Sequence, residues 1–280
     1  MPEIQLTQGV VRYRDQGAGA PILLIHGLLV NGNVWDRLVP LLAAHGRCIV
    51  PDLPLGSHSV PMNKGADLSA PGLARLIAEF IERLELEDVM VVGNDTGGAL
   101  CQLVVAHHPE RIGRLVLTTC DAFENFPPPA VRPLLTALKL PGALAATSVL
   151  GRLRAVRGAA FKAMPLTMQP IADEQVKSWV APLADKRIRA DLATVVRGID
   201  PADTVAAGER LRDFDGPALI AWGAEDRIFP FSDAEHLAAI LPNARLERIP
   251  NARAFVQLDA PERLAELIGS VTNGAVTTPA

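Results

Sequence analysis

The sequence of 280 residues has few aromatic side chains, few cysteines and few histidines. Aromatic residues make up 4% of the chain, and Tyr13 is its one tyrosine. The cysteines, Cys48, Cys101 and Cys120, are odd in number and lie in apolar runs, which indicates reduced core thiols rather than a disulfide framework. Their spacing fits no zinc site, so we expect neither a metal nor a cofactor.

The chain also lacks an excess of basic charge. Its net charge is -4, whereas proteins that bind nucleic acids usually carry an excess of basic residues. No apolar run is long enough to span a membrane, and the N-terminus, MPEIQLTQG, alternates like a strand rather than a signal peptide. We therefore expect a cytoplasmic protein, a monomer or homodimer, that binds a small molecule and neither nucleic acid nor a membrane.

Short apolar runs alternate with helical patterns along most of the chain. The runs cover residues 21–27, 47–54, 88–94, 114–120, 217–223 and 244–250. Runs of this length separated by helices predict parallel βαβ units. The class predicted is α/β, with a mostly parallel sheet flanked by helices.

This alternation stops between residues 124 and 212. The segment begins with FPPP at residues 126–129 and continues as helical patterns, of which Asp200 and Pro201 are expected to begin the last. The sequence thus predicts a core of residues 1–123 and 213–271, an inserted helical cap of residues 124–212, and a disordered tail of residues 272–280. We expect the cap cations Arg152, Arg154, Arg157 and Lys162 on a solvated helix face rather than a membrane-binding surface.

The stretch GNDTGG at residues 93–98 places Asp95 between an apolar strand and an apolar helix. Such a strand, sharp turn and helix form the geometry of a nucleophile elbow. A phosphate loop would require Lys or GxGxxG, and Asp95 would repel the anion. A helix N-cap is the remaining alternative, but it does not explain three glycines around one carboxylate. We therefore interpret Asp95 as a nucleophile.

At this point the chain resembles the α/β-hydrolase superfamily, in the branch with an aspartate nucleophile that includes haloalkane dehalogenases, epoxide hydrolases and fluoroacetate dehalogenase. The resemblance covers nearly the whole chain outside residues 126–212. It rests on HGLLVNGNVWDRLVP, PDLPLGSHS, GNDTGG, AHHPERIGRLVL and WGAEDRIFP, in this order and spacing. It implies the α/β-hydrolase fold with a helical cap, and a hydrolase for a small, largely apolar substrate.

The resemblance also implies roles for individual residues. Asp95 would attack an electrophilic carbon and form an ester on its own side chain. The backbone N–H groups of Leu28 and Thr96 would form the oxyanion hole. Asp226 would be the orienting acid, with a turn carboxylate that caps the helix near Ser232 as the alternative.

The histidine that this pattern requires is missing. The segment IPNARAFVQLDAPE at residues 249–262 places Ala254 at its position, and no histidine follows His236. Hydrolysis of the ester needs a base to activate water, so loss of the histidine would slow that step by orders of magnitude. His58, in a loop at the carboxyl end of the sheet, is a candidate substitute base, with a polar loop role as the alternative.

Several residues are expected near the substrate. His26 belongs to the oxyanion loop, Phe255 follows Ala254, and the cap supplies Phe161, Met164, Met168 and Trp179, although core packing explains these cap residues equally well. Asp121, just past the strand at 114–120, is a further candidate at the carboxyl end of the sheet. Without the histidine it would only cap a helix of the inserted segment or brace that segment. Arg253 would neutralise Asp226 if its side chain turned inward.

The sequence argues against two activities of the aspartate branch. Thr96 and Leu28 stand where dehalogenases often have the tryptophan and asparagine that hold the halide. Tyr13 lies outside the cap, whereas epoxide hydrolases depend on cap tyrosines. An impaired or non-standard hydrolase centred on Asp95 remains the first hypothesis. The alternatives are a catalytically silent binding or regulatory protein and a non-hydrolytic enzyme with Asp95 as general base.

Overall fold

The computed structural model describes the backbone of residues 1–272, and their side chains except those of residues 160–162 and 272. The predicted disordered tail lies outside the described residues, apart from Thr272 at the end of the last helix.

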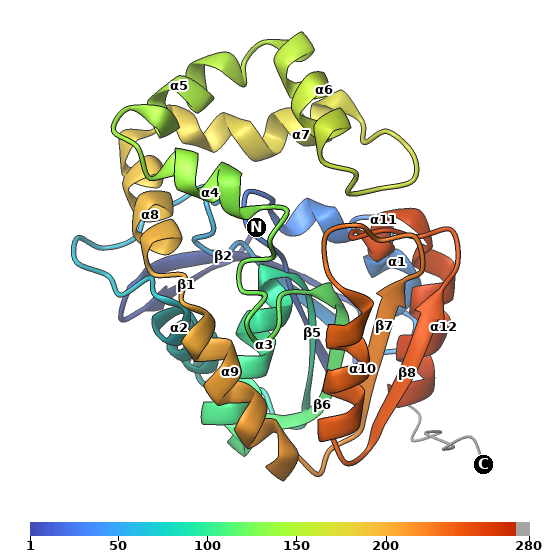
Figure 1. The fold of residues 1–280 in the computed structure, drawn as a ribbon. Coiled ribbons are helices and arrows are strands. Elements are labelled where there is room, and N and C mark those ends of the chain that lie inside the picture. Colours follow the sequence, from blue (N-terminus) through green and yellow to red (C-terminus); the bar gives the residue numbers. More distant parts are fainter. Residues whose placement is uncertain (273–280) are drawn as a thin grey trace.

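The core of the protein is an eight-stranded sheet (Figure 1). Its strands are β1 (Glu3–Leu6), β2 (Gly9–Gln16), β3 (Pro21–Ile25), β4 (Arg47–Pro51), β5 (Val89–Asp95), β6 (Ile112–Cys120), β7 (Ala218–Gly223) and β8 (Ala244–Ile249). Their order is β1-β2-β4-β3-β5-β6-β7-β8. The pairs β1–β2 and β2–β4 are antiparallel and all the others are parallel, which confirms the predicted sheet.

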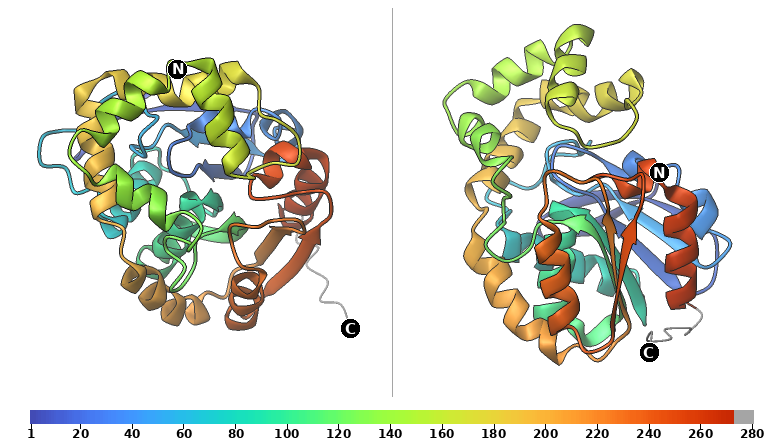
Figure 2. Two further views of the ribbon diagram at one scale, coloured as in Figure 1. Left: turned by 45° about the horizontal axis from the view of Figure 1, so that its top comes forward. Right: turned by 45° about the vertical axis from the view of Figure 1, so that its right-hand side comes forward.

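Helices cover both faces of this sheet (Figures 1 and 2). On one face α2 (Ala70–Arg83), α3 (Thr96–His107) and α9 (Pro201–Arg210) pack side by side, while α1 (Val39–Leu42) and α12 (Pro261–Thr272) pack together on the other. Helix α10 (Phe231–Ile240) packs on β7 and β8, and the short α11 (Val256–Asp259) precedes α12. Helix α3 is buried nearly all round, as its apolar sequence predicts.

A helical lid lies over the carboxyl ends of the parallel strands (Figure 2). It contains α4 (Arg132–Leu138), α5 (Ala143–Leu150), α6 (Arg154–Ala163), α7 (Asp173–Val180) and α8 (Lys186–Arg197). Within the described residues no single helix is long and apolar enough to cross a membrane; α4 and α5, bent by 105° at the break between them, pass that test as a pair by length and composition only.

The lid ends earlier than the sequence predicts. Asp200 caps α9 as expected, since its side chain accepts the Ala202 N–H. Helix α9 nevertheless packs against α3 of the core, and the Thr204 hydroxyl donates a 2.6 Å hydrogen bond to the Phe123 carbonyl. The predicted boundary at residue 212 therefore assigns one core helix to the lid.

Asn33 joins the lid to the core. Its amide donates to Ser178 Oγ at 2.7 Å, its side-chain oxygen accepts from Trp179 Nε1 at 2.5 Å, and its carbonyl accepts from Gln175 Nε2 at 3.0 Å. All three partners lie on α7. Arg132, the first residue of α4, donates to the carbonyls of Glu124 and Pro127 in the segment after β6. In the part of the chain that the structure describes, no hydrogen bond of this kind joins α5 or α6 to the core.

Candidate active site

Asp95 occupies a strained turn at the end of β5. Its φ of 56° lies in the left-handed region that residues other than glycine seldom adopt, and α3 begins at the next residue. The turn is tight because α3 approaches β6 closely: a Cβ on Gly98 would lie 2.2 Å from Cys120 Cβ. This is the strand, turn and helix arrangement of a nucleophile elbow.

Two backbone N–H groups hold one oxygen of Asp95. Its Oδ1 accepts from Thr96 N at 2.5 Å and from Leu28 N at 3.3 Å, the two donors that the sequence predicts for the oxyanion hole. Glycine at position 27 permits this approach, because a Cβ there would lie 2.5 Å from Asp95 Oδ1. Burial raises the pKa of Asp95, and the two hydrogen bonds oppose that rise.

A cavity of 210 Å³ lies between Asp95 and the lid. Four of its lining residues have a hydroxyl or carboxyl group: Asp95, Thr96, Asp121 and Thr147. Most of the remaining wall is apolar and comes from the loop after β3, the lid and the loops after β7 and β8. The volume is below the range usual for drug-sized ligands, so the cavity suits a small apolar molecule.

Asp121, a candidate from the sequence at the carboxyl end of the sheet, belongs to the cavity wall. It follows β6 and is 2% exposed. Its Oδ2 accepts a 3.0 Å hydrogen bond from the Thr96 hydroxyl, whereas its Oδ1 is buried without a partner among the described residues. Burial and the nearby charge of Asp95 raise the pKa of Asp121 well above its usual range. Two carboxyl groups thus lie at the floor of the cavity.

Asp226 lies in the loop after β7 and is held by backbone N–H groups. Its Oδ2 accepts from Phe229 N at 2.7 Å and from Ile228 N at 3.3 Å, while its Oδ1 is buried without a partner in the described part of the chain. Burial raises the pKa of Asp226 to about 6. Ala254 is 0% exposed and supplies no polar side chain.

Arg253 does not neutralise Asp226. Its guanidinium donates to the Thr167 carbonyl at 3.0 Å, and its backbone N–H donates to Asp259 Oδ2 at 3.0 Å. The side chain therefore fastens the lid loop to the loop after β8, which corrects the inward orientation considered from the sequence.

Asn94 and Gln257 position the backbone of residue 254. The Asn94 amide donates to the carbonyls of Thr118, Thr119 and Ala254, the last at 2.8 Å, and Gln257 Nε2 donates to Asn94 Oδ1 at 2.8 Å. Sequence reasoning missed both residues. The available signal was a polar amide inside an otherwise apolar strand, directly before Asp95.

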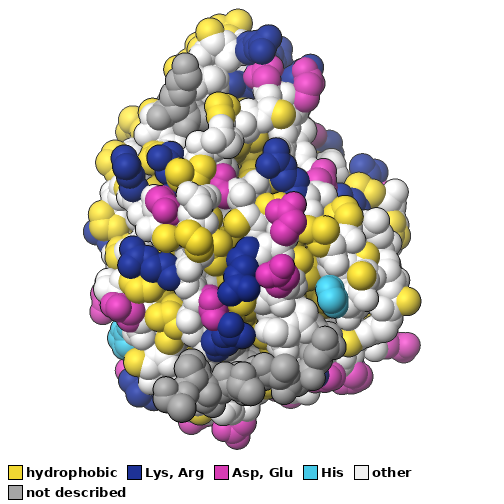
Figure 3. All heavy atoms as spheres, turned by 90° about the vertical axis from the view of Figure 1, so that its right-hand side faces the viewer, with side chains coloured by type: hydrophobic (Ala, Val, Ile, Leu, Met, Phe, Trp, Pro, Cys, Tyr) yellow, Lys and Arg dark blue, Asp and Glu magenta, His cyan; other side chains and the backbone are white. Residues whose placement is uncertain are grey.

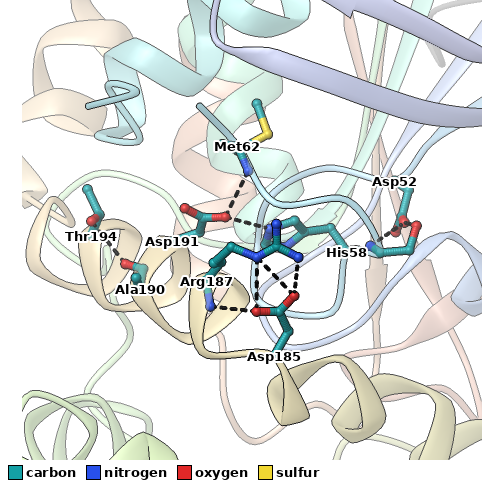
Figure 4. Close-up of polar contacts among 9 residues, drawn as sticks. Asp52, His58, Met62, Asp185, Arg187, Ala190, Asp191 and Thr194 are labelled. Carbon is teal, nitrogen blue, oxygen red and sulfur yellow. Dashed lines mark hydrogen bonds and ion pairs between the residues drawn. The ribbon is translucent and has the colours of Figure 1, made fainter. Parts of the chain in front are cut away.

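His58 lies outside the cavity wall, contrary to its expected role as a base. The residue is 1% exposed, and Nε2 lies 3.1 Å from Asp191 Oδ2 on α8, which also accepts the Met62 N–H at 3.0 Å (Figure 4). The pair links the loop after β4 to the lid. Its position supports the polar loop role that was the alternative.

The side chain of His26 is also engaged outside the cavity. Its Nε2 accepts the Leu53 N–H at 3.0 Å, so Nδ1 carries the proton that is donated to the Gly27 carbonyl at 2.9 Å. Burial lowers the pKa of His26, which favours this neutral ring. His26 therefore shapes the oxyanion loop and is not among the residues that line the cavity.

The remaining residues expected near the substrate divide into three groups. Met164, Trp179 and Phe255 line the cavity. Met168 lines a separate pocket beside Arg253. The side chain of Phe161 lies outside the described residues. Among the described side chains, no group of three His, Cys, Asp or Glu residues could hold a metal ion.

Comparisons with known proteins agree with this fold. The sequence model of the alpha/beta hydrolase family matches residues 22–267. The chain is 26% identical to haloalkane dehalogenase 2 of Mycobacterium tuberculosis, over 94% of this chain and 91% of that protein. It is 27% identical to the 2-hydroxy-6-oxononadienedioate/2-hydroxy-6-oxononatrienedioate hydrolase 2 of Pseudomonas putida, over 92% of this chain and 90% of that protein.

A solved structure gives the same result for the fold alone. The meta-cleavage product hydrolase from Pseudomonas fluorescens aligns with a TM-score of 0.81 at 20% identity, over 98% of each chain. The match of the family model over most of the sequence, together with the sheet order and lid, identifies the family. The chain belongs to the alpha/beta hydrolase family.

Proposed function

We propose that this protein is a hydrolase that attacks a small, largely apolar substrate with Asp95. The observation that carries the proposal is the seating of Asp95 Oδ1 on the N–H groups of Leu28 and Thr96. With Oδ1 held there, Oδ2 is the oxygen for attack. It forms a bond to an electrophilic carbon of the substrate, and the leaving group departs with the electron pair of the broken bond.

Hydrolysis of the resulting ester is the impaired step. Water would attack the ester carbon, and the negative charge that develops on Oδ1 would be stabilised by the same two N–H groups. The attacking water needs a base, however, and no histidine is among the residues that line the cavity. The resemblance to the aspartate branch implies an imidazole at Ala254 and an orienting acid at Asp226, and the buried alanine and the unpartnered Oδ1 of Asp226 support the loss of that base. We therefore infer that the ester accumulates.

A halide is not the leaving group that we favour, because a departing halide needs side-chain N–H donors. Several relatives are named haloalkane dehalogenases. In this chain Leu28 and Thr96 bring no side-chain N–H to the cavity, and the Trp179 N–H is bonded to Asn33. A departing halide would find no stabilising side-chain N–H at these positions, so we favour a leaving group that needs none.

A binding protein without turnover is the second candidate, and the absence of a base at Ala254 favours it. Use of Asp95 as a general base in non-hydrolytic chemistry is the third. The three functions differ in whether a bond to Asp95 forms and whether Asp95 is needed for binding.

The test is the intact mass of the protein after incubation with haloalkanes, epoxides and activated esters, with product measured in the same samples. We expect an adduct that maps to Asp95, with little product. Asp95→Asn should form no adduct, whereas the matched variant Asp121→Asn should still form one. Product without any adduct would support a general base. Neither adduct nor product, with ligand binding retained by Asp95→Asn, would support a binding protein.

A further inference from the structure

Exposed apolar side chains are concentrated on the lid. Apart from Met1, every large hydrophobic residue that is exposed in the described part of the chain lies on α4–α6 or in the turns between these helices. These residues are Leu134, Leu140, Val149, Leu150, Leu153 and Val156. Their exposed fractions reach 62% at Leu140 and Val149. An apolar surface confined to one region usually marks an interaction site.

The same region carries positive charge only. The sequence has no Asp or Glu between Glu124 and Asp173, although the whole chain has a net charge of -4. Its basic residues over this stretch are Arg132, Lys139, Arg152, Arg154, Arg157 and Lys162. The chain as a whole is acidic, so α4–α6 form a local basic region on an acidic protein.

The first acidic residue after this stretch, Asp173, is paired with Arg157. The Arg157 side chain is 6% exposed and makes a two-pronged ion pair with Asp173, at 3.0 and 2.7 Å. It also donates to the carbonyls of Gly151 and Arg152, which brackets α6 against the preceding turn. Arg154 lies only 3.8 Å from the same carboxylate, yet its side chain is 85% exposed. Arg157 is therefore structural, and Arg154 remains available to an outside partner.

Residues 149–156, which we call the lid tip, combine both properties. Consecutive turns connect them, since Leu153 N donates to the Leu150 carbonyl and Val156 N to the Leu153 carbonyl. Arg152 and Arg154 are exposed between these apolar side chains. The lid tip lies at the end of the molecule farthest from the sheet (Figure 1). At that end Figure 3 shows hydrophobic and basic side chains, with acidic side chains beside them.

We propose that the lid tip docks on the surface of an anionic lipid bilayer. Exposed leucine and valine side chains insert at the boundary between headgroups and acyl chains, while arginines beside them bind the anionic headgroups. A second copy of this chain fits less well, because a two-fold contact would bring the basic tips together. The sequence predicts a solvated face for Arg152, Arg154, Arg157 and Lys162. That prediction is wrong for Arg157, which is buried against Asp173, and the side chain of Lys162 lies outside the described residues. The exposed apolar neighbours of Arg152 and Arg154 point to a lipid surface.

Docking would bring the substrate cavity to the membrane. The inner sides of α4 and α5 supply Leu135, Leu138 and Thr147 to the cavity wall. Small apolar molecules partition into bilayers, so a lid held at the lipid surface would take up substrate where it is most concentrated. The docking itself does not depend on chemistry at Asp95.

The test is co-sedimentation of the full-length protein with vesicles of phosphatidylcholine, with or without phosphatidylglycerol. We expect binding to the anionic vesicles that is at least about tenfold stronger than to the neutral ones and that weakens with added salt. Arg152→Glu/Arg154→Glu should weaken binding at least about tenfold. Leu150→Ser/Leu153→Ser should weaken it as well, and this loss should persist at high salt.

The matched control is Arg83→Glu/Arg212→Glu. It makes the same charge change at exposed residues on α2 and just after α9, away from the lid (Figure 1), and should bind as the unchanged protein does. Circular dichroism confirms that each variant is folded, and Leu153→Ser alone replaces the double variant if that one is not. Absent binding to anionic vesicles, or equal losses in the control, would overturn the proposal. Sedimentation velocity showing a dimer that the leucine variants dissociate, without vesicle binding, would also overturn it in favour of self-association.

Discussion

The Thr96 hydroxyl donates a 3.0 Å hydrogen bond to Asp121 Oδ2, while the backbone N–H of the same residue donates to Asp95 Oδ1. One residue thus holds two carboxyl groups at the floor of an apolar cavity. The hydroxyl stabilises the Asp121 anion, but burial and the charge of Asp95 raise its pKa more strongly. These opposing effects favour a state in which the two carboxyl groups, of Asp95 and Asp121, share a proton.

Replacing Thr96 by valine should therefore destabilise the protein. Thr96→Val leaves Asp121 Oδ2 without its donor and raises the pKa of Asp121 further. We expect the free energy of unfolding at neutral pH to fall by roughly 1–2 kcal/mol in urea titrations. Thr96→Ser keeps the hydroxyl and should lose much less. Equal losses in the two variants would show that the hydrogen bond contributes nothing.

Asp226→Asn should change how stability depends on pH. The pKa of Asp226 is raised from 3.8 to about 6 by burial. A carboxyl group with a raised folded-state pKa stabilises the protein fully below its unfolded value and loses that contribution as pH rises through its folded value. Between pH of about 4 and 7, the stability of the unchanged protein relative to Asp226→Asn should fall by on the order of 2 kcal/mol. Urea titrations over this range measure the difference, and a constant difference would contradict the assignment.

Ala254→His should shorten the lifetime of the ester on Asp95. The backbone at residue 254 is held by Asn94, and Asp226 has an unpartnered oxygen that could accept an imidazole N–H. We expect product release to increase, at a cost in stability of about 1–3 kcal/mol, because Ala254 is completely buried.

The control for that change is Ala254→His/Asp226→Asn. It should show a smaller increase in product release than Ala254→His, because the orienting carboxylate is lost. Mass measurements of the adduct over time report both lifetimes. An adduct of unchanged lifetime in a folded Ala254→His protein would contradict the proposal that a histidine at position 254, oriented by Asp226, is what the site lacks.

His58→Ala should affect stability and leave adduct formation unchanged. The substitution leaves the Asp191 carboxylate without its ring partner between the core and the lid, so we expect a loss of roughly 1–3 kcal/mol in the free energy of unfolding. Asp191→Asn is the companion variant and should act in the same direction. A His58→Ala protein of normal melting temperature that no longer forms the adduct would restore the histidine as a candidate base.

The fold could be read from the sequence because its signals are local. The strands β3 to β7 are short, mostly apolar runs, and the glycines around Asp95 mark a turn too tight for side chains at positions such as Gly98. The end of the lid could not be read in this way. The pattern of α9 resembles that of the lid helices, and only its packing on α3 shows that it belongs to the core.

The candidate site was predictable where backbone geometry determines it and unpredictable where distant side chains pair. The donors at Leu28 and Thr96 follow from the elbow and the oxyanion loop. His58 finds its partner 133 residues away, and Gln257 reaches Asn94 across 163 residues. No spacing in the sequence indicates such pairs, so a histidine at the correct edge of the sheet proved to be engaged elsewhere.

The three hydrogen bonds at Asn33 divide the lid into a fixed part and a part free to move. Helix α7 is fastened to the core. Helix α4 is held only at its first residue, Arg132, to the segment after β6, and α5 and α6 have no such bond in the described part of the chain. Local opening of a protein begins where few bonds have to break. Any widening of the cavity would therefore occur by an outward swing of α4 and α5, with Trp179 staying in place as a fixed wall.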